Sequence, residues 1–435
     1  MITHCGVFAT TSNDIKDTIY GLEKLQHRGQ ESCGISFLQN DKIVTYRKIG
    51  FVKDSFDAIN NVKSKMFIGH VRYSTSGSKN DNSLIQPLKI FDNSNVITFA
   101  YNGNIPLVNN NNTFISDSMF VQHFLQKHIN NNIIQTLSYF LQSITGVYSM
   151  VVLTNNSIYA LRDSTGNRPL HIGIRDGVYC IASETCAFGN FKHIRPVYPG
   201  ELVSINNNIL KTEFKVLPNM KFCSMELIYF MKPESKYNAY TVEYTRKYFG
   251  EMLADQEEYN INGIVVGSPS SGIIAGKAYA NKLKIKYEQL ITKNSNYNKR
   301  SFIMNNNDDR LKICREKFIF DKDRINNKKI IIVDDSIVRG ITMKYIIQLL
   351  KECNAKEIHI RVASPPLKYT CNYGVDIPTK NELIAHNKSI DEIKNYLGVN
   401  TIKYLNISYL KTKDKCTACF NGEYNINVTD IEDLI

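Results

Sequence analysis

The pattern of apolar and polar positions changes between the two halves of the chain. In the first half, short segments rich in β-branched and aromatic residues are separated by turns, and residues 149–153 and 178–182 are predicted to be strands. From about Asn260 onward, short apolar segments such as 264–266 and 330–333 alternate with helical stretches. This alternation indicates βαβ units and a parallel sheet, which binds its ligands beyond the carboxyl ends of its strands.

Helical periodicity predicts three amphipathic helices. The first places Ile15 and Leu22 on one face and ends near Gly29, and the second begins after Asp117. The third follows the apolar segment 330–333 and has apolar residues four positions apart. These residues are Ile341, Tyr345, Leu349 and Cys353. The asparagine-rich stretches at residues 109–112, 206–208 and 305–307 are predicted to be exposed turns.

Length and composition narrow the class of protein. A chain of 435 residues is too long for a single core, so two domains are expected. No apolar run approaches the ~18 residues of a membrane span, and no signal peptide is recognisable, so we expect a soluble, cytoplasmic protein without a membrane partner. Ten cysteines are too few for a disulfide scaffold, so in a reducing compartment they should be core, catalytic or metal-bound.

The formal net charge of +12 raises the question of a nucleic-acid partner. The lysines, however, are scattered among asparagines, with no basic stripe and no aromatic-plus-basic RNA-binding motif. We therefore expect no nucleic-acid partner. The same positive charge would attract a small polyanionic substrate.

Cys5 lies so close to the start of the chain that it becomes the first residue if four residues are removed. It would then carry both a nucleophilic thiol and a free α-amino group, and that amine can act as the base for the thiol. The alternative is an ordinary buried cysteine in a first strand.

The segment from Val333 to Thr342 joins a buried strand to two acidic residues, a loop and a helix. The free N–H groups at the start of such a helix suit a phosphate. Asp334 and Asp335 suit a ribose diol and the Mg²⁺ that accompanies a pyrophosphate. Taken alone, the acidic pair is also compatible with solvated side chains that cap a helix.

This segment closely resembles the phosphoribosylpyrophosphate (PRPP) signature of type I phosphoribosyltransferases. Together with Cys5, it resembles the amidophosphoribosyltransferase family over nearly the whole chain. The matching segments are Cys5 to Phe8, Leu25 to Glu31, Gly69 to Tyr73, Tyr101 to Asn104, Gly166 to Leu170, Ser183 to Phe188, Cys223 to Glu226, Val333 to Gly340 and Tyr373 to Asp376.

The resemblance implies two domains after a propeptide at residues 1–4. Residues 5–230 should form an N-terminal-nucleophile hydrolase domain of αββα type, the glutamine amidotransferase. Residues 231–435 should form an α/β type I phosphoribosyltransferase domain with a parallel sheet and the C-terminal cysteine pair. The implied enzyme transfers ammonia from glutamine to C1 of PRPP, giving 5-phosphoribosylamine, glutamate and pyrophosphate, the first step of de novo purine biosynthesis.

The resemblance also implies residues for each site. For glutamine, Cys5 is the nucleophile, and Asn102 and the backbone N–H of Gly103 form the oxyanion hole. Arg72 should pair with the α-carboxylate and Asp117 with the α-ammonium group of glutamine.

For PRPP, the resemblance assigns Mg²⁺, one ion per subunit, to Ser271, Asp334 and Asp335. The loop from residue 336 to 342 should hold the 5′-phosphate. Its expected contacts are Ser336, Val338, Arg339, Gly340 and Thr342.

The pair Cys416 and Cys419 is, taken alone, compatible with zinc binding, redox activity or no role. The resemblance is to the iron–sulfur branch of the family, in which four cysteines hold one 4Fe–4S cluster per subunit. The matching cysteines are Cys223, Cys371, Cys416 and Cys419. Thiolate tetrads bind zinc as well as iron–sulfur clusters, so zinc stays open. Core packing is expected for the other internal cysteines, which are Cys33, Cys180, Cys186, Cys314 and Cys353.

The chain departs from the family's pattern in the segment 293–302, which lacks a glycine, and at Ser270 and Ile341. These departures concern closure over PRPP and affinity for it. The family forms tetramers and dimers, so a homo-oligomer is expected. Purine nucleotides are candidate inhibitors, and the sequence leaves open whether they inhibit this chain. The alternatives are another amidotransferase sharing the first half, a PRPP-sensing regulator, and an enzyme that uses free ammonia.

Overall fold

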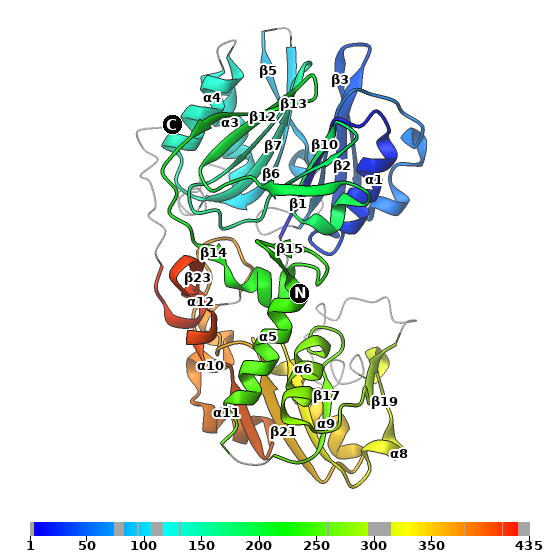
Figure 1. The fold of residues 1–435 in the computed structure, drawn as a ribbon, viewed down its shortest axis with the longest axis vertical. Helices are drawn as coiled ribbons and strands as arrows, with labels where there is room; N and C mark the ends of the chain where they lie inside the picture. Colours follow the sequence, from blue (N-terminus) through cyan, green and yellow to red (C-terminus); the bar gives the residue numbers. More distant parts are fainter. Residues whose placement is uncertain are drawn as a thin grey trace.

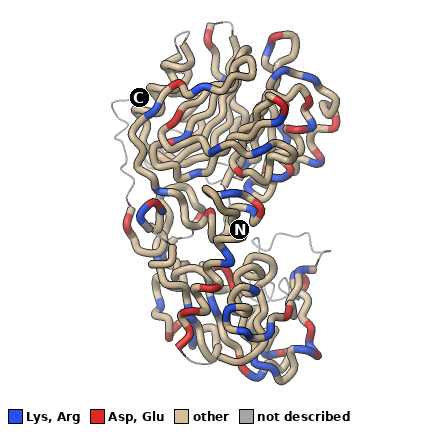
Figure 2. Tube along the Cα trace, viewed as in Figure 1, with Lys and Arg blue, Asp and Glu red and all other residues tan. Residues whose placement is uncertain are grey.

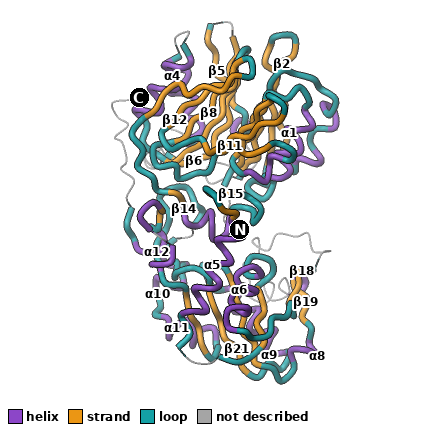
Figure 3. Tube along the Cα trace, in the orientation of Figure 1, coloured by secondary structure: helices purple, strands orange, loops and turns teal. Residues whose placement is uncertain are grey.

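The computed structural model describes residues 4–73, 82–93, 95–105, 116–129, 132–258, 261–294, 315–377, 379–410 and 412–424. The molecule has two lobes with a connecting segment between them (Figure 1). Strands dominate the first lobe, whereas helices and strands alternate in the second (Figure 3). Figure 2 shows basic and acidic residues interspersed over both lobes. The asparagine-rich turns predicted at residues 109–112 and 305–307, and Cys314, lie outside the described residues.

Two antiparallel sheets lie against each other in the first lobe. The first contains, in spatial order, β11 (Lys192–Pro196), β9 (His171–Arg175), β10 (Val178–Ala182), β1 (Gly6–Thr10), β4 (Phe67–Arg72), β2 (Ser32–Gln39) and β3 (Lys42–Ile49). The second contains β13 (Ile209–Lys215), β12 (Glu201–Asn206), β8 (Ser157–Arg162), β7 (Val147–Leu153), β6 (Asn95–Asn104) and β5 (Leu88–Asp92).

A helix layer covers the outer face of each sheet. Helix α1 (Ile15–Lys24) packs on the first sheet, where its buried Leu22 joins Phe8 in one apolar cluster. Helices α3 (Asp117–His128) and α4 (Ile133–Ser143) pack on the second sheet through a separate cluster. Alternate residues of both sheets, such as Ala9 and Val151, fill the space between them. These four layers confirm the predicted αββα arrangement. The first helix is shorter than predicted, because it ends at Lys24 and turns follow.

The second lobe contains a four-stranded parallel sheet. Its order is β17 (Ile264–Gly267), β20 (Lys329–Asp334), β21 (Glu357–Val362) and β22 (Thr401–Tyr404). One face packs on α5 (Val242–Asp255) and α6 (Ile273–Leu283), and the other on α9 (Ile341–Glu352) and α11 (Ile390–Leu397). Strands β17 and β20 are buried between the helix layers and consist mainly of continuous apolar residues. A parallel sheet with helices on both faces confirms the predicted α/β architecture.

Smaller elements complete the second lobe and the connection. They are β18 (Ile291–Lys293) paired with β19 (Phe318–Phe320), β15 (Lys236–Tyr237) paired with β16 (Tyr240–Thr241), α8 (Lys322–Ile325), α10 (Ile384–Asn387) and α12 (Ala418–Asn421). Short 3₁₀ helices lie at Val52–Asp54, Asp57–Ile59, Asn82–Leu84, Thr185–Phe188, Lys380–Glu382, Ile407–Leu410 and Thr412–Asp414.

The connecting segment belongs to both lobes. Strand β14 (Phe222–Cys223) pairs in parallel with β23 (Lys415–Cys416), so the connection meets the last part of the described chain. A single turn of π-helix follows at Glu226–Phe230. Ile228 and Phe230 pack in an apolar cluster of the second lobe, whereas Glu226 contacts the first lobe. The domain boundary after residue 230 stays a prediction.

Candidate active sites

Cys5 lies just before β1 and is partly buried. Its thiol donates a hydrogen bond to the carbonyl oxygen of Tyr73 at 3.5 Å, and its own carbonyl accepts one from Arg28 Nε at 3.1 Å. Burial raises the pKa of the Cys5 thiol to about 11. In a chain that still carries His4, the thiol is therefore protonated at neutral pH.

Asn102 lies near the end of β6, and its side chain is only 2% exposed. The amide Nδ2 has no hydrogen-bond acceptor among the described residues. Ala100 precedes it by two positions on the same face of the strand and packs with Val7 of β1 between the sheets. Asn102 therefore faces the side on which β1 begins. A buried amide donor without an acceptor is suited to an oxygen atom of a ligand.

Arg72 and Asp117 are both close to Cys5 in space. Arg72 ends β4, next to β1, and its positive charge lowers the pKa of the Cys5 thiol, whereas the charge of Asp117 raises it. Asp117 begins α3 and accepts hydrogen bonds from Ser118 N at 2.8 Å and Tyr101 Oη at 3.2 Å. Burial raises the pKa of Asp117 to about 6. The structure thus brings Cys5, Arg72 and Asp117 together.

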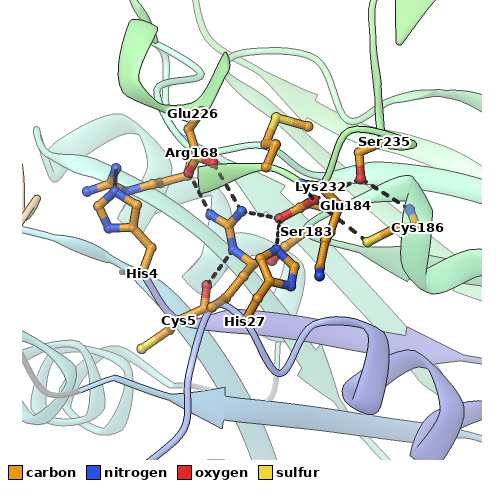
Figure 4. A network of polar contacts seen from close by, with 12 residues as sticks. His4, Cys5, His27, Arg168, Ser183, Glu184, Cys186, Glu226, Lys232 and Ser235 are labelled. Atoms are coloured by element: carbon orange, nitrogen blue, oxygen red, sulfur yellow. Dashed lines mark hydrogen bonds and ion pairs between the residues drawn. The ribbon is translucent and has the colours of Figure 1, made fainter. Parts of the chain in front are cut away.

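A buried ionic network lies directly behind Cys5 (Figure 4). Arg28 is 1% exposed and pairs with Glu184 through Nη1 and with Glu226 through Nη2 at 2.6 Å. Burial alone would raise the pKa of Glu184, but His27 and Arg28 outweigh it and hold that pKa well below its usual range. Glu226 belongs to the connecting π-helix, so this network joins the Cys5 backbone to the connecting segment. Arg28 lies in the segment Leu25 to Glu31, which the sequence analysis matched to the family. No local sequence pattern predicted that Arg28 pairs with Glu226, which lies 198 positions away.

His4 is also buried, at 4% exposed. Its side chain lies beside Arg168 (Figure 4), with Nε2 2.8 Å from Arg168 Nη1. Its ring packs edge-on against Phe230, with the ring centroids 4.6 Å apart. Arg168 Nη2 donates to the carbonyl oxygen of Tyr373, which belongs to the second lobe. His4 therefore occupies a position where the first lobe, the connecting segment and the second lobe meet.

The second site lies at the carboxyl end of β20. Ser271 Oγ lies 3.5 Å from Asp334 Oδ1, and Ser336 Oγ donates to Asp335 Oδ2 at 2.8 Å. Burial and the neighbouring charge of Asp335 raise the pKa of Asp334 well above its usual value. The three residues assigned to magnesium therefore adjoin one another.

Two loops border this acidic pair. At Gly272 a side chain would clash with the carbonyl oxygen of Val333, so the loop before α6 packs closely on the end of β20. Gly340 has a φ of +73° at the start of α9, a conformation that favours glycine. The predicted phosphate loop therefore ends at a helix N-terminus. Within it, the Arg339 side chain pairs with Glu382 at 2.6 Å, while Thr342 is exposed in the first turn of α9.

Lys293 is a further candidate that the sequence interpretation did not assign. Its Nζ lies 3.2 Å from Ser270 Oγ, in the loop before α6. A cation at this position suits a phosphate group. The sequence feature that could have pointed to Lys293 is its place at the start of the atypical segment 293–302. The residues of this segment beyond 294 lie outside the described part of the chain.

The four predicted cluster cysteines are neighbours. Cys223 and Cys416 are directly paired in the β14–β23 ladder, and Cys419 follows in α12. Burial raises the pKa of the Cys419 thiol, and the other three cysteines contribute in the same direction. The Cys371 sulfur accepts a hydrogen bond from Tyr373 N at 3.3 Å. Within the described ranges, no three His, Cys, Asp or Glu side chains form a group that could hold a metal ion.

Comparison with known proteins decides the family. The profile of the phosphoribosyl transferase domain matches residues 246–369. The amidophosphoribosyltransferase of Bacillus subtilis is 34% identical over 97% of this chain and 94% of its own length. That of Pyrococcus horikoshii is 36% identical over 97% and 96%. The chain belongs to the amidophosphoribosyltransferase family.

Solved structures agree with the family assignment. The B. subtilis glutamine PRPP amidotransferase complexed with ADP and GMP superposes with a TM-score of 0.88 at 32% identity, covering 98% of both chains. A structure described as the allosteric regulatory enzyme of purine biosynthesis gives 0.89 at 33% identity, covering 99% and 98%. The predicted fold and the predicted enzyme, a glutamine-dependent amidophosphoribosyltransferase of purine biosynthesis, are confirmed. No helix in the described ranges is long and apolar enough to cross a membrane.

Proposed function

We propose that the chain divides its reaction between the two sites, with glutamine opened at Cys5 and PRPP held at Asp334 and Asp335. The observation that carries the proposal is the grouping of Arg72 and Asp117 around the Cys5 thiol, beside the buried amide of Asn102. An amino acid needs a cation for its carboxylate, an anion for its ammonium group and donors for its developing oxyanion.

In the glutamine site, the Cys5 sulfur attacks the side-chain amide carbon and the α-amino group of a processed Cys5 takes the thiol proton. Asn102 Nδ2 and the Gly103 N–H donate to the oxyanion. When the tetrahedral intermediate collapses, the proton passes to the leaving nitrogen and ammonia departs. Water then hydrolyses the thioester and releases glutamate.

In the second site, the ammonia nitrogen attacks C1 of PRPP, the bond to pyrophosphate breaks and the nitrogen loses a proton. The loop from Ser336 to Thr342 binds the 5′-phosphate, with donors at the start of α9. Ser271, Asp334 and Asp335 would hold a magnesium ion, which neutralises pyrophosphate charge when bound. Ammonia must reach this site unprotonated, because ammonium is not a nucleophile.

Contacts between the lobes support a shielded route for ammonia. Tyr73 Oη donates to Asp376 Oδ2 at 3.0 Å, and Asn104 Nδ2 donates to the carbonyl oxygen of Asn372 at 3.0 Å. Tyr73 directly follows Arg72, and Asn104 directly follows Gly103. Residues next to the proposed glutamine site therefore contact the second lobe.

Asp335→Asn tests the proposed division of labour. We expect synthesis of phosphoribosylamine to fall about a hundredfold from either glutamine or ammonia, because an essential charge at the PRPP site is lost. Glutamine hydrolysis should continue. The measurements are pyrophosphate release and glutamate release on the same preparation. Asp321→Asn is the matched control, since it changes an exposed helix cap in the same lobe. Equal loss of both activities in a folded Asp335→Asn protein contradicts the division.

Removal of residues 1–4 is a second proposal, supported by the position of Cys5. While the nitrogen of Cys5 is bonded to His4 it is not a base, and burial holds the thiol protonated. We expect the intact mass of active enzyme to begin at Cys5. Iodoacetamide should alkylate Cys5 in processed protein much faster than in unprocessed protein, with the fully buried Cys33 as an internal control. Full activity in protein that retains Met1 would exclude this requirement.

The four cysteines supply the thiolate donors that a thiolate-bound cluster needs, although their side chains are not grouped as metal ligands among the described residues. Cys371 and Cys416 pack against an apolar cluster of Val147, Tyr373 and Ala418, while Cys223 and Cys419 belong to an apolar cluster of the second lobe. Thiolates in such surroundings suit iron–sulfur or zinc. Cys223, Cys371, Cys416 and Cys419 would hold the group, which would add its binding free energy to the stability of the fold.

Anaerobically purified protein is expected to be brown, with about four irons and four acid-labile sulfides per chain. Cys416→Ser should bleach it and lower the melting temperature. Cys353→Ser, which changes a buried cysteine outside this group, should keep the colour. Stoichiometric zinc without labile sulfide would replace the iron–sulfur assignment and leave the amidotransferase assignment intact.

The remaining expectations are proposals of the same kind. A solved relative is complexed with ADP and GMP, which supports purine nucleotides as ligands and inhibitors of this chain. We retain the domain division at residue 230, a homo-oligomeric tetramer or dimer and a cytoplasmic location.

A further inference from the structure

Tyr101 is a fully buried residue that contacts two parts of the proposed glutamine site. Its hydroxyl donates to Asp117 Oδ2 at 3.2 Å. A Cβ atom added at Gly103 would lie 2.6 Å from both Cζ and Oη of Tyr101, so the ring packs directly against that glycine. One side chain thus supports both the oxyanion-hole backbone and the anion proposed for the ammonium group.

Backbone hydrogen bonds and a neighbouring ring hold Tyr101 in position. Its N–H donates to Gln86 Oε1 at 2.6 Å, and its carbonyl oxygen accepts from His70 Nε2 at 3.1 Å. Burial lowers the pKa of His70 to about 3, so this imidazole is neutral and adds no charge. The Tyr148 ring lies 6.4 Å away, centroid to centroid. A phenol held in this way offers its proton in one direction, toward Asp117.

We propose that Tyr101 is a positioning residue for glutamine. Its hydroxyl orients the Asp117 carboxylate toward the α-ammonium group, and its ring sets the place of the Gly103 N–H. This inference rests on the proposed function, because Asp117 and Gly103 are glutamine contacts only there.

The electrostatic surroundings of Asp117 make the role measurable. Burial raises the pKa of this carboxyl to about 6, and the hydrogen bond from Tyr101 acts against burial by favouring the ionised form. The other titratable and charged groups around this pair are Cys5, Arg72 and Glu31 on the side of the thiol, and Tyr148 and Arg168 on the side of the Tyr101 ring. Removing the Tyr101 hydroxyl therefore raises the pKa of Asp117 further, and the site loses its anion at a higher pH.

The experiment is Tyr101→Phe in the full, processed chain. Loss of a hydrogen bond to a charged group should raise KM for glutamine about tenfold, with kcat within about twofold. Ammonia-dependent synthesis should not change. The acid limb of kcat/KM for glutamine should move to higher pH, since this limb reports the free enzyme.

Two comparisons separate positioning from a general packing defect. For 4-carbamoylbutanoate, which is glutamine without its α-amino group, Tyr101→Phe should change kcat/KM less than twofold. Tyr148→Phe removes a buried hydroxyl that donates to the carbonyl oxygen of Ile144 at 3.3 Å, and it should leave KM and the acid limb unchanged. An unchanged KM and acid limb in Tyr101→Phe, or equal losses for both substrates, would overturn the inference.

Asp117→Asn distinguishes this inference from the function on which it rests. A wild-type KM for glutamine in Asp117→Asn means that the proposed ammonium contact is wrong. The proposed role of Tyr101 would then be wrong as well. A raised KM in Asp117→Asn combined with a wild-type KM in Tyr101→Phe leaves the proposed site standing and overturns the role of Tyr101 alone.

Discussion

Cys5→Ala is expected to lower glutamine-dependent synthesis of phosphoribosylamine at least a thousandfold while leaving ammonia-dependent synthesis within about twofold of wild type. The sulfur is the attacking atom at the glutamine site, and no neighbouring group replaces it. Ammonia from solution bypasses this step, because PRPP is bound by the other lobe. The measurement is pyrophosphate release with glutamine or with ammonium chloride as nitrogen donor.

The alanine variant needs a background in which processing plays no part. A chain expressed from a start codon placed directly before position 5 serves for both wild type and variant. Cys180→Ala is the matched control, because it removes a buried thiol from the strand next to β1. It should retain both activities. If Cys5→Ala lost ammonia-dependent synthesis while remaining folded, the two sites would not be separate.

Arg28→Met is expected to destabilise the protein by about 3–5 kcal/mol, because it leaves two buried carboxylates without their shared cation. Glu184 and Glu226 are both fully buried. The quantity compared is the free energy of unfolding at pH 7, obtained from thermal and denaturant unfolding of wild type and variant. Arg175→Met, which breaks a half-buried pair with Asp17, should cost less than about 1 kcal/mol.

The loss of stability in Arg28→Met is expected to depend on pH. The depressed pKa of Glu184 contributes stability above its unfolded-state value of 4.5, and this contribution is lost as the pH falls toward the folded-state pKa. The difference between wild type and Arg28→Met should therefore shrink below about pH 4. Adding Glu226→Gln to Arg28→Met should restore part of the stability by removing one uncompensated charge. A difference that grows in acid would contradict this account of the network.

Local sequence patterns were sufficient for the strands and helices that build the second site. Val265 and Ile331 lie in apolar segments that form the adjacent parallel strands β17 and β20, and Asp334 lies at the carboxyl end of β20 as expected. The contacts that organise the first site were not predictable in this way. Tyr101 and Asp117 meet across a segment outside the described residues, and Arg28 meets Glu226 from a distant part of the chain. Periodicity reports which face of an element is buried, not which remote side chain it meets.

The pairing of β14 with β23 limits how the protein can be divided. Cutting the chain after residue 230 would leave Cys223 on one fragment and Cys371, Cys416 and Cys419 on the other. It would also separate the Phe222–Cys223 strand from its ladder partner near the described end of the chain. The carboxyl fragment would expose the unpaired edge of β23 and the apolar surface that Ile228 and Phe230 cover in the intact protein. Separate expression of the two halves should therefore yield an aggregating carboxyl fragment, and co-expression of both fragments should restore its solubility.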